Sequence, residues 1–358
     1  MTKLQQLMDE LHSDINVLAL TASSTDLISL RSKFINVNVT PIPDIKYDFV
    51  FIDNKLINLY NLNDIWDRLS YSCVLYINNF NYSHQNSTNT KCIQFLKKNQ
   101  KNIIISRQMM VNGTQEQFMI VKCFPESETY KKFTKPNDKP LIIASVLKTG
   151  GIYTIEYVNR LAKAVKRNIN IPYKFICITD AQHNQFCEDV HQTISFAQNY
   201  PKWWGKVELF RTGLFSNHRV VYFDLDTLII DNIDFIYEYT GVFSGLRDFY
   251  HMISMGSGVM CWDGDDIRLY EIYSQFVSNA QYHMTNNPSG DQQWINTITK
   301  NYLQYIQDYF PHKIVSFKKD CYINNVVNFP NTASIVCFHG PPRMHDLENN
   351  EKIKMHWY

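Results

Sequence analysis

Two acidic residues, Asp224 and Asp226, interrupt an otherwise apolar stretch of the sequence at positions 220–230. The surrounding β-branched and aromatic residues predict a strand buried on both faces, where an ionised carboxyl group needs a compensating partner. Side chains two residues apart on a strand point to the same side, so we expect the two carboxylates to lie together at the strand's carboxyl end. Paired carboxylate oxygens suit a divalent cation whose other ligands are water and phosphate.

Three interpretations of this pair are open. It resembles the DxD motif of GT-A glycosyltransferases, which holds a metal on a nucleotide-sugar diphosphate. It also resembles the DxDGT motif of HAD-type phosphatases, whose first Asp is the nucleophile. The third interpretation is an edge strand with two solvated acids. Thr227 follows Asp226 directly, so the glycine of the phosphatase motif is missing. The remaining motifs of the chain have to distinguish these interpretations.

Length and composition limit the protein class. A chain of 358 residues is long enough for two domains. The net charge of +1 excludes a strongly basic surface for nucleic acid or for an acidic membrane. The eight cysteines show no CxxC spacing, which predicts reduced, buried thiols. No apolar run approaches the roughly 20 residues of a membrane span, and the first 14 residues lack an apolar signal region. We therefore expect a cytoplasmic protein with no membrane span and no nucleic-acid partner.

The first part of the chain, residues 1–136, alternates short apolar runs with polar, helix-patterned segments. The expected strands are 17–20, 49–52, 74–77, 103–105 and 118–121, and the expected helices are 63–69, capped by Asn63, and 90–99. The alternation predicts a parallel α/β sheet, with the last two strands forming an antiparallel hairpin.

This order of elements resembles the second half of a class I methyltransferase. The turn after residues 17–20 reads Thr21-Ala22-Ser23-Ser24 and lacks the glycines that let backbone approach a cofactor. We therefore expect a degenerate, non-catalytic Rossmann-like domain that acts as a scaffold or mediates homo-oligomerisation. The charged, proline-bearing segment 126–140 reads as a linker, so we expect a second domain at 137–358.

The second domain begins with a strand, 141–146, a loop containing Gly150-Gly151, and a helix at 155–167. A second strand then ends at Asp180, and a helix containing Lys206-Val207-Glu208-Leu209-Phe210 leads to the DxD strand. Three further motifs follow, Ser257-Gly258-Val259, Asp291-Gln292 and His339-Gly340-Pro341-Pro342-Arg343. Together these motifs resemble glycosyltransferase family 8, the group of glycogenin and bacterial galactosyltransferases, over residues 141–358. The resemblance implies an α/β fold in which a GT-A, Rossmann-like nucleotide-binding domain follows the smaller Rossmann-like domain.

The resemblance also implies a metal ion and a nucleotide-sugar donor, with UDP as the expected nucleotide. The implied metal ligands are Asp224, Asp226 and His339, with His345 and His356 as fallback candidates. An imidazole nitrogen among oxygen ligands favours Mn²⁺ over Mg²⁺. The implied donor-binding residues are Thr149, Gly150, Tyr153, Asp180, Lys206, Asp224, Gly340 and Arg343. Of these, Arg343 is suited to clamp a diphosphate with its guanidinium, whereas Lys206 could equally be a surface lysine.

The implied catalytic residues are Asp291 and Gln292 beside the reacting carbon, and Asp248 on the sugar hydroxyls. Family 8 enzymes retain anomeric configuration, but Asp291 could instead be the general base of an inverting enzyme. An alternative for Asp248 is a loop acid paired with Arg247. We interpret Trp203, Trp204 and Trp262 as core residues.

The expected reaction is transfer of a hexose from a UDP-sugar to a hydroxyl of a glycan or protein acceptor. The enzymatic alternative is a HAD-type phosphatase, with Asp224 as nucleophile, Asp226 as acid, and Asp265 and Asp266 as metal-binding acids. The non-enzymatic alternative is a carbohydrate- or partner-binding protein on a GT-A fold.

Overall fold

A computed structural model describes residues 15–42, 44–53, 62–80, 94–95, 98–99, 103–109, 116–122, 139–238 and 243–358. The chain divides into two compact units, and each is described by itself. The first contains the described residues among 1–128 together with Arg247–Ser254 and Gln307–Pro311. The second contains those among 129–246, 255–306 and 312–358. The expected boundary at residues 136 and 137, and most of the expected linker, lie outside the described residues.

The first unit contains a six-stranded sheet in the order β2-β1-β3-β4-β6-β5. Its strands are β1 Asn16–Leu20, β2 Asn36–Asn38, β3 Tyr47–Asp53, β4 Leu69–Phe80, β5 Ile103–Met109 and β6 Glu116–Lys122. The first four run parallel, and β6 pairs antiparallel with both β4 and β5. The predicted parallel sheet with a terminal hairpin is therefore confirmed.

Both faces of this sheet are buried. Leu18 and Leu20 belong to one hydrophobic cluster, whereas Val17 and Ala19 belong to another, as the two-residue period of a strand requires. The helices of the unit are α2 Ser24–Lys33 and α3 Leu62–Trp66. The expected helix 63–69 was too long, because β4 already begins at Leu69. Part of the expected helix 90–99 lies outside the described residues.

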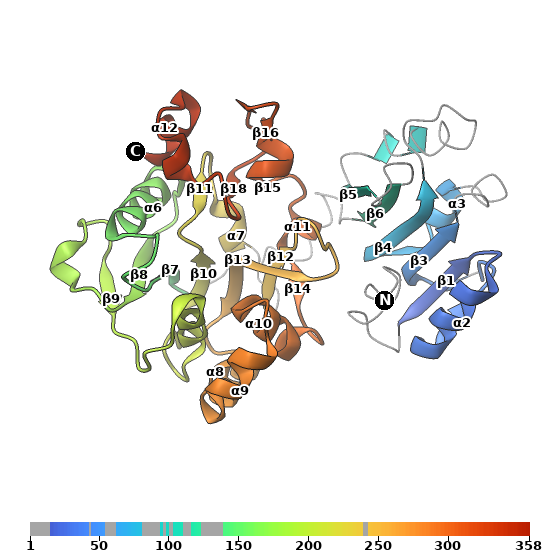
Figure 1. The fold of residues 1–358 in the computed structure, drawn as a ribbon, viewed down its shortest axis with the longest axis horizontal. Coiled ribbons are helices and arrows are strands. Elements are labelled where there is room, and N and C mark those ends of the chain that lie inside the picture. Colours follow the sequence, from blue (N-terminus) through green and yellow to red (C-terminus); the bar gives the residue numbers. More distant parts are fainter. Residues whose placement is uncertain are drawn as a thin grey trace. The chain divides into compact units, whose positions relative to one another are not determined.

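The second unit is built on a seven-stranded sheet in the order β14-β12-β13-β10-β7-β8-β9 (Figure 1). Its strands are β7 Leu141–Leu147, β8 Tyr173–Thr179, β9 Gln192–Ile194, β10 Arg219–Phe223, β12 Ser244–Arg247, β13 Met255–Asp263 and β14 Gln304–Tyr305. The strands β10, β7, β8 and β9 run parallel, and β13 runs antiparallel to β10. Smaller sheets are formed by β11 Thr227–Ile229, β18 Ile335–Cys337 and β15 Ile314–Ser316, and by β16 Tyr322–Ile323 and β17 Val326–Val327.

Helices cover these sheets. The α-helices are α6 Ile155–Asn168, α7 Asp234–Glu238, α8 Tyr270–Ser278, α9 Ala280–Asn286, α10 Asp291–Thr299, α11 Ile306–Tyr309 and α12 Glu351–Trp357. Shorter helical turns are η3 His183–Gln185, η4 Lys202–Phe210, η5 Ile267–Leu269, η6 Phe317–Cys321 and η7 Met344–Leu347. The 3₁₀ helix η4 contacts both α8 and α10, and the α-helices α6 and α12 pack on β11. The α/β fold class expected for both parts of the chain is confirmed.

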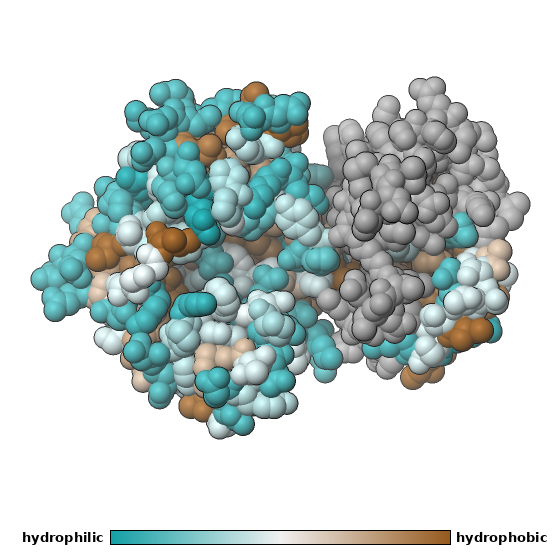
Figure 2. All heavy atoms as spheres, viewed as in Figure 1, coloured by the Kyte–Doolittle hydropathy of each residue, from teal (hydrophilic) through white to brown (hydrophobic). Residues whose placement is uncertain are grey.

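The described surface is mostly hydrophilic and the described cysteines are free thiols, as the composition predicts. On the face shown in Figure 2, most described residues of the second unit are hydrophilic, and hydrophobic ones appear in small groups. Among the described residues, no helix is both long and apolar enough to cross a bilayer. The six described cysteines are free thiols and five of them are buried. Cys92 and Cys123 lie outside the described residues.

Candidate active site

Asp224 and Asp226 lie in a turn rather than within one strand. The strand β10 ends at Phe223 and β11 begins at Thr227, in a different sheet. The turn is held by the Thr227 amide, which donates to the Asp224 carbonyl (3.1 Å), and by the Phe338 amide, which donates to the Asp226 carbonyl (3.0 Å). The prediction of one continuous strand was wrong. The two carboxylates nevertheless lie at the carboxyl end of a parallel strand, where ligands bind in open α/β sheets.

Lys206 is buried among the acids of this site. Its Nζ lies 3.0 Å from Oδ1 of Asp224 and 3.0 Å from Oδ2 of Asp291. Only 8% of the Lys206 side chain is exposed, so the alternative of a surface lysine is wrong. Burial alone would lower the pKa of Lys206, but the two carboxylates outweigh it and raise that pKa above its ordinary value.

The first residues of α10 join the site through Ser257 of β13. The Ser257 hydroxyl accepts a hydrogen bond from Lys206 (3.0 Å) and donates one to Oδ2 of Asp291 (3.0 Å). The Ser257 amide donates to Oε1 of Gln292 (3.3 Å). Since β13 pairs with β10, the structure brings the predicted Asp291 and Gln292 together with the DxD turn.

Two tyrosines hydrogen-bond the DxD carboxylates. The Tyr153 hydroxyl donates to Oδ2 of Asp226 (2.7 Å), and the Tyr222 hydroxyl donates to Oδ1 of Asp224. Burial and the neighbouring charge of Asp224 raise the pKa of Asp226 to about 7. Burial also raises the pKa of Asp224, with the Asp291 charge adding to it and Lys206 opposing it. The pair therefore carries more negative charge than its neighbours neutralise.

The predicted nucleotide loop lies at the ends of β7 and β8. The Thr149 amide donates to Oδ1 of Asp180 (2.9 Å), and Lys148 Nζ lies 2.5 Å from Oδ2 of the same carboxylate. Although burial opposes it, these bonds hold the pKa of Asp180 below its ordinary value. Gly150 has a φ of +83°, and a Cβ there would meet no atom within 4 Å, so this turn borders open space.

The segment after β18 supplies His339, Gly340 and Arg343. The His339 Nε2 lies 2.6 Å from the Ser316 hydroxyl. Gly340 has a φ of +78°, a conformation that favours glycine. The Arg343 Nε is buried without a hydrogen-bond partner among the described residues. A hydrogen bond with Arg343 lowers the pKa of Tyr153, although burial and Asp226 raise that pKa overall. An orphaned guanidinium nitrogen of this kind suits an anionic ligand.

The fallback ligands lie elsewhere in the second unit. The His345 Nδ1 shares a hydrogen bond with the Tyr157 hydroxyl, and the His356 ring contacts Phe329. Within the described ranges, no three His, Cys, Asp or Glu side chains lie close enough together to hold a metal ion. The described contact of His339 is the one with Ser316. The two carboxylates by themselves still fit a divalent cation, because carboxylate oxygens are the ligands that Mg²⁺ and similar ions prefer.

Asp248 belongs to the first unit, unlike the other predicted site residues. Its Oδ1 accepts hydrogen bonds from the amides of Tyr250 (2.7 Å) and His251 (2.8 Å). Arg247, the partner named in the alternative for Asp248, forms an ion pair with Asp308 at 2.6 Å. The described contacts of Asp248 are those of a turn-forming carboxylate.

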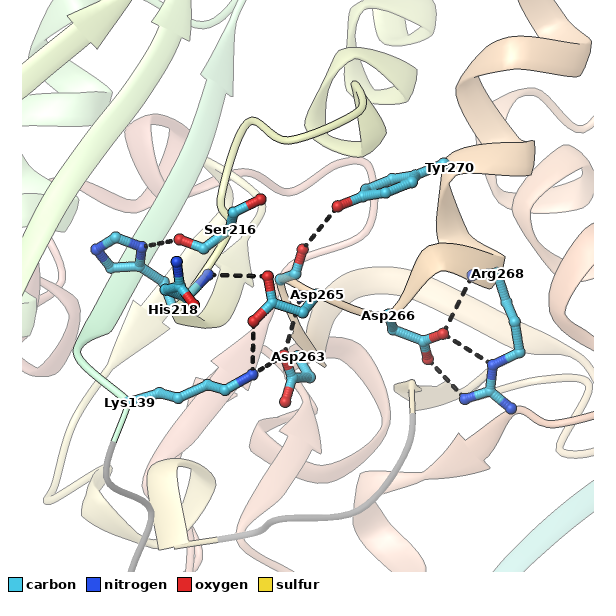
Figure 3. A network of polar contacts seen from close by, with 10 residues as sticks. Lys139, Ser216, His218, Asp263, Asp265, Asp266, Arg268 and Tyr270 are labelled. Atoms are coloured by element: carbon cyan, nitrogen blue, oxygen red, sulfur yellow. Dashed lines mark hydrogen bonds and ion pairs between the residues drawn. The ribbon is translucent and has the colours of Figure 1, made fainter.

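We call Asp224, Asp226, Asp291 and Lys206 the carboxyl-edge cluster. A second group, the amino-edge cluster, contains Asp263, Asp265 and Asp266 with Lys139 and Arg268 (Figure 3). Lys139 Nζ lies 2.6 Å from Asp263 and 2.8 Å from Asp265, and Arg268 lies 2.6 Å from Asp266. Asp263 pairs in register with Arg219, the first residue of β10, so this cluster lies at the opposite edge of the sheet. The acids that the phosphatase alternative needs are thus paired with cations away from the DxD turn.

Sequence reasoning missed two contributors to the site and the exposure of one tryptophan. Tyr222 lies two residues before Asp224, and the strand period alone could have placed it on the same face. Ser257 was noticed only as part of a motif, and nothing in the sequence shows that it links Lys206 to Asp291. Trp203 is 50% exposed, against our interpretation of a core residue, whereas Trp204 and Trp262 are buried as expected.

No protein-family model matches the sequence, and no curated protein matches it. Solved structures resemble it in fold. The galactosyltransferase LgtC, in complex with donor and acceptor sugar analogues, is 12% identical, with 57% of this chain and 88% of that chain covered and a TM-score of 0.41. The apo-form glycosyltransferase GlyE of Streptococcus pneumoniae is 13% identical, with 57% and 56% covered and a TM-score of 0.39.

Solved methyltransferase structures also resemble part of this chain. The O-methyltransferase TomG of Streptomyces achromogenes, in complex with SAM, is 8% identical, with 34% of this chain and 79% of that chain covered and a TM-score of 0.27. The two glycosyltransferase structures cover 57% of this chain, and the methyltransferase structure covers 34% of it. At these identities and scores the likeness concerns the fold alone, so functional conclusions have to come from the residues of the site.

Proposed function

We propose that this chain is a metal-dependent glycosyltransferase that moves a hexose from a UDP-sugar to a hydroxyl of a glycan or protein acceptor. The observation that carries the proposal is the carboxyl-edge cluster. Two carboxylates, those of Asp224 and Asp291, meet one buried lysine there, and the nearby Asp226 has a pKa raised to about 7. A buried excess of negative charge is stable only with a cation or a proton, and perturbed groups of this kind concentrate at functional sites.

Asp224 and Asp226 are the residues that would hold the metal ion, Mn²⁺ or Mg²⁺. A bound divalent cation would neutralise the diphosphate leaving group. The Tyr153 and Tyr222 hydroxyls orient the two carboxylates by donating a hydrogen bond to each. His339 is assigned as the third ligand, since its Nε2 pairs with Ser316 and a histidine ligand usually keeps such a hydrogen bond on its second nitrogen.

The donor nucleotide is assigned to Thr149, Gly150, Asp180 and Gly340. Arg343 is assigned to the diphosphate, because its Nε is buried without a partner among the described residues. A guanidinium matches phosphate oxygens in geometry and charge.

We also propose that the chain divides into two domains at residues 136 and 137, and that the first domain is catalytically inert. Absence of S-adenosylmethionine binding by calorimetry is the expected result for that domain.

Chemistry at the sugar is assigned to Asp291, Gln292 and Lys206. Lys206 and Ser257 hold the Asp291 carboxylate in place, which favours an electrostatic role for Asp291 over proton abstraction. We therefore propose retention of anomeric configuration, with attack on the same face that the nucleotide leaves. Proton NMR of the first product formed would separate the outcomes, since an inverted anomer would make Asp291 a general base.

The decisive test measures UDP release from UDP-glucose and UDP-galactose with Mn²⁺ and with EDTA. The wild type should turn over a UDP-sugar only with metal. Asp226→Asn should lower kcat/KM at least about 100-fold, since a loss of about 3 kcal/mol of transition-state stabilisation has that effect. Asp265→Asn in the amino-edge cluster is the matched control and should stay within about twofold.

Two results would favour the alternatives. Hydrolysis of p-nitrophenyl phosphate without UDP-sugar turnover, lost in Asp224→Asn, would establish the phosphatase. Metal-dependent UDP binding by calorimetry without turnover of any sugar nucleotide would establish a binding protein on this fold.

A further inference from the structure

Trp203 exposes a large aromatic surface next to the candidate active site. It is the second residue of η4, and 50% of it is exposed, whereas the adjacent Trp204 is 5% exposed. In a 3₁₀ helix, residues three apart lie above one another on the same face. Trp203 therefore lies on the same face of η4 as Lys206, the buried cation of the carboxyl-edge cluster.

The Trp203 indole also lies against the turn that begins α10. A Cβ placed on Gly290 would be 2.4 Å from the indole Nε1, so the ring touches the backbone directly at this glycine. Gly290 has a φ of +84° and immediately precedes Asp291. Two separate observations therefore place the indole beside the candidate active site. Trp203 lies on the same face of η4 as Lys206, and its ring contacts Gly290, which precedes Asp291.

The helix that carries Trp203 is firmly anchored. The Glu208 carboxylate is fully buried and accepts hydrogen bonds from the amides of Ala197 (2.9 Å) and Gln198 (2.8 Å). Trp204 stacks on Phe276 with ring centroids 4.9 Å apart. The position of η4 is therefore fixed, and Lys202 Nζ lies over the Trp203 ring, 5.4 Å from its centroid.

We propose that Trp203 is the platform on which a sugar ring of the acceptor stacks. The C–H bonds on one face of a pyranose carry partial positive charge and are attracted to the electron-rich face of an indole. A donor sugar has to be enclosed away from water, whereas an acceptor glycan extends into solvent and can use a half-exposed ring. This inference rests on the proposed function, and it makes the acceptor a carbohydrate rather than a peptide hydroxyl without sugar.

The test compares Trp203→Ala, Trp203→Phe and Tyr282→Ala in the full chain. Tyr282 is the matched control, because it is 58% exposed on α9. Methyl glycosides of glucose, galactose and N-acetylglucosamine, with their disaccharides, serve as acceptors and as probes in saturation-transfer NMR. We expect Trp203→Ala to raise the acceptor KM at least about tenfold, with the donor KM changing less than about twofold. Trp203→Phe should keep most acceptor affinity, because it retains a ring.

Each outcome has a distinct meaning. The inference is overturned if Trp203→Ala and Tyr282→Ala have the same acceptor KM, or if the wild type binds no glycoside by NMR. Glycoside binding that is lost in Trp203→Ala but accompanied by no sugar-nucleotide turnover supports the sugar platform and overturns the transferase. Equal melting temperatures of the three variants exclude misfolding as the cause of a loss.

Discussion

The two acid clusters of the second unit have similar composition and opposite electrostatics. Each contains three aspartates, and they lie at opposite edges of the seven-stranded sheet. In the amino-edge cluster, Lys139 and Arg268 pair with all three acids, and the side chains of Asp263 and Asp265 are 43% and 40% exposed. In the carboxyl-edge cluster, one lysine that is 8% exposed pairs with Asp224, whose side chain is 31% exposed, and with Asp291, whose side chain is 7% exposed.

The ionisation of the two clusters differs accordingly. Hydrogen bonds from Lys139 and from the Asn217 amide hold the pKa of Asp265 below its ordinary value. Burial and repulsion between carboxylates raise the pKa of Asp224 and of Asp226. Counting acidic residues therefore does not find the functional site. The informative quantity is negative charge that the fold leaves unbalanced, because only that charge gains from binding a cation or a proton.

The largest expected difference between the clusters is the effect of removing the lysine. Lys206→Met leaves Asp224 and Asp291 facing each other without their shared cation, and should lower the free energy of unfolding by about 3 kcal/mol. Lys139→Met removes partners from exposed acids and should cost about 1 kcal/mol or less. Urea unfolding of both variants measures the difference. Equal losses would mean that the two clusters are energetically alike.

A smaller effect is expected from adding one methyl group at a glycine beside each cluster. A Cβ on Gly264 would lie 1.9 Å from the Phe215 carbonyl oxygen, whereas a Cβ on Gly258 would lie 3.6 Å from Asp224 Oδ2. Gly264→Ala should therefore cost about 2 kcal/mol or more, because the backbone has to move. Gly258→Ala should cost less than about 1 kcal/mol. Thermal unfolding of both is the measurement, and a more damaging Gly258→Ala would contradict a tightly packed amino edge.

The smallest effect concerns pH. Because the pKa of Asp226 is raised in the folded state, its contribution to stability is complete below its ordinary pKa near 4 and is lost as pH rises through about 7. Asp226→Asn mimics the protonated form. In EDTA, urea unfolding should show the wild type losing stability relative to Asp226→Asn between pH 5.5 and 8, because the folded carboxyl group is ionised over that range.

For Asp265 the pH dependence of stability is reversed. Its contribution to the free energy of unfolding is present above the ordinary pKa of an Asp and is lost as pH falls through the lowered pKa. Asp265→Asn should therefore show no change relative to wild type between pH 5.5 and 8. A constant difference between wild type and Asp226→Asn over this range would show that Asp226 is not destabilised as an anion.

Most strands of the fold could be predicted from the sequence, because buried strands are short apolar runs bounded by polar segments. The DxD turn could not. The residues after Asp226 are as apolar as those before Asp224, so local pattern gives no reason to end β10 at Phe223. The break depends on pairing of β11 with β18, more than 100 residues later in the sequence.

The site residues that belong to a sequence motif could be predicted, whereas the contacts that depend on side-chain packing could not. Structure and sequence agree that Asp224, Asp226, Tyr153, Lys206 and Asp291 come together. The link through Ser257 and the pairing of Arg247 with Asp308 depend on which side chains meet after folding. The exposure of Trp203 was missed because two adjacent tryptophans read as core, although neighbours on a helix point in different directions.

The junction between β10 and β11 has a consequence for the order of events during synthesis. The Asp226 carbonyl is bonded by the Phe338 amide, and β11 is held by residues 335–337. Asp224 and Asp226 leave the ribosome long before those residues do. The nascent chain therefore carries both acids without the strand that shapes their turn, and the turn reaches its final form only after residue 338 has been synthesised.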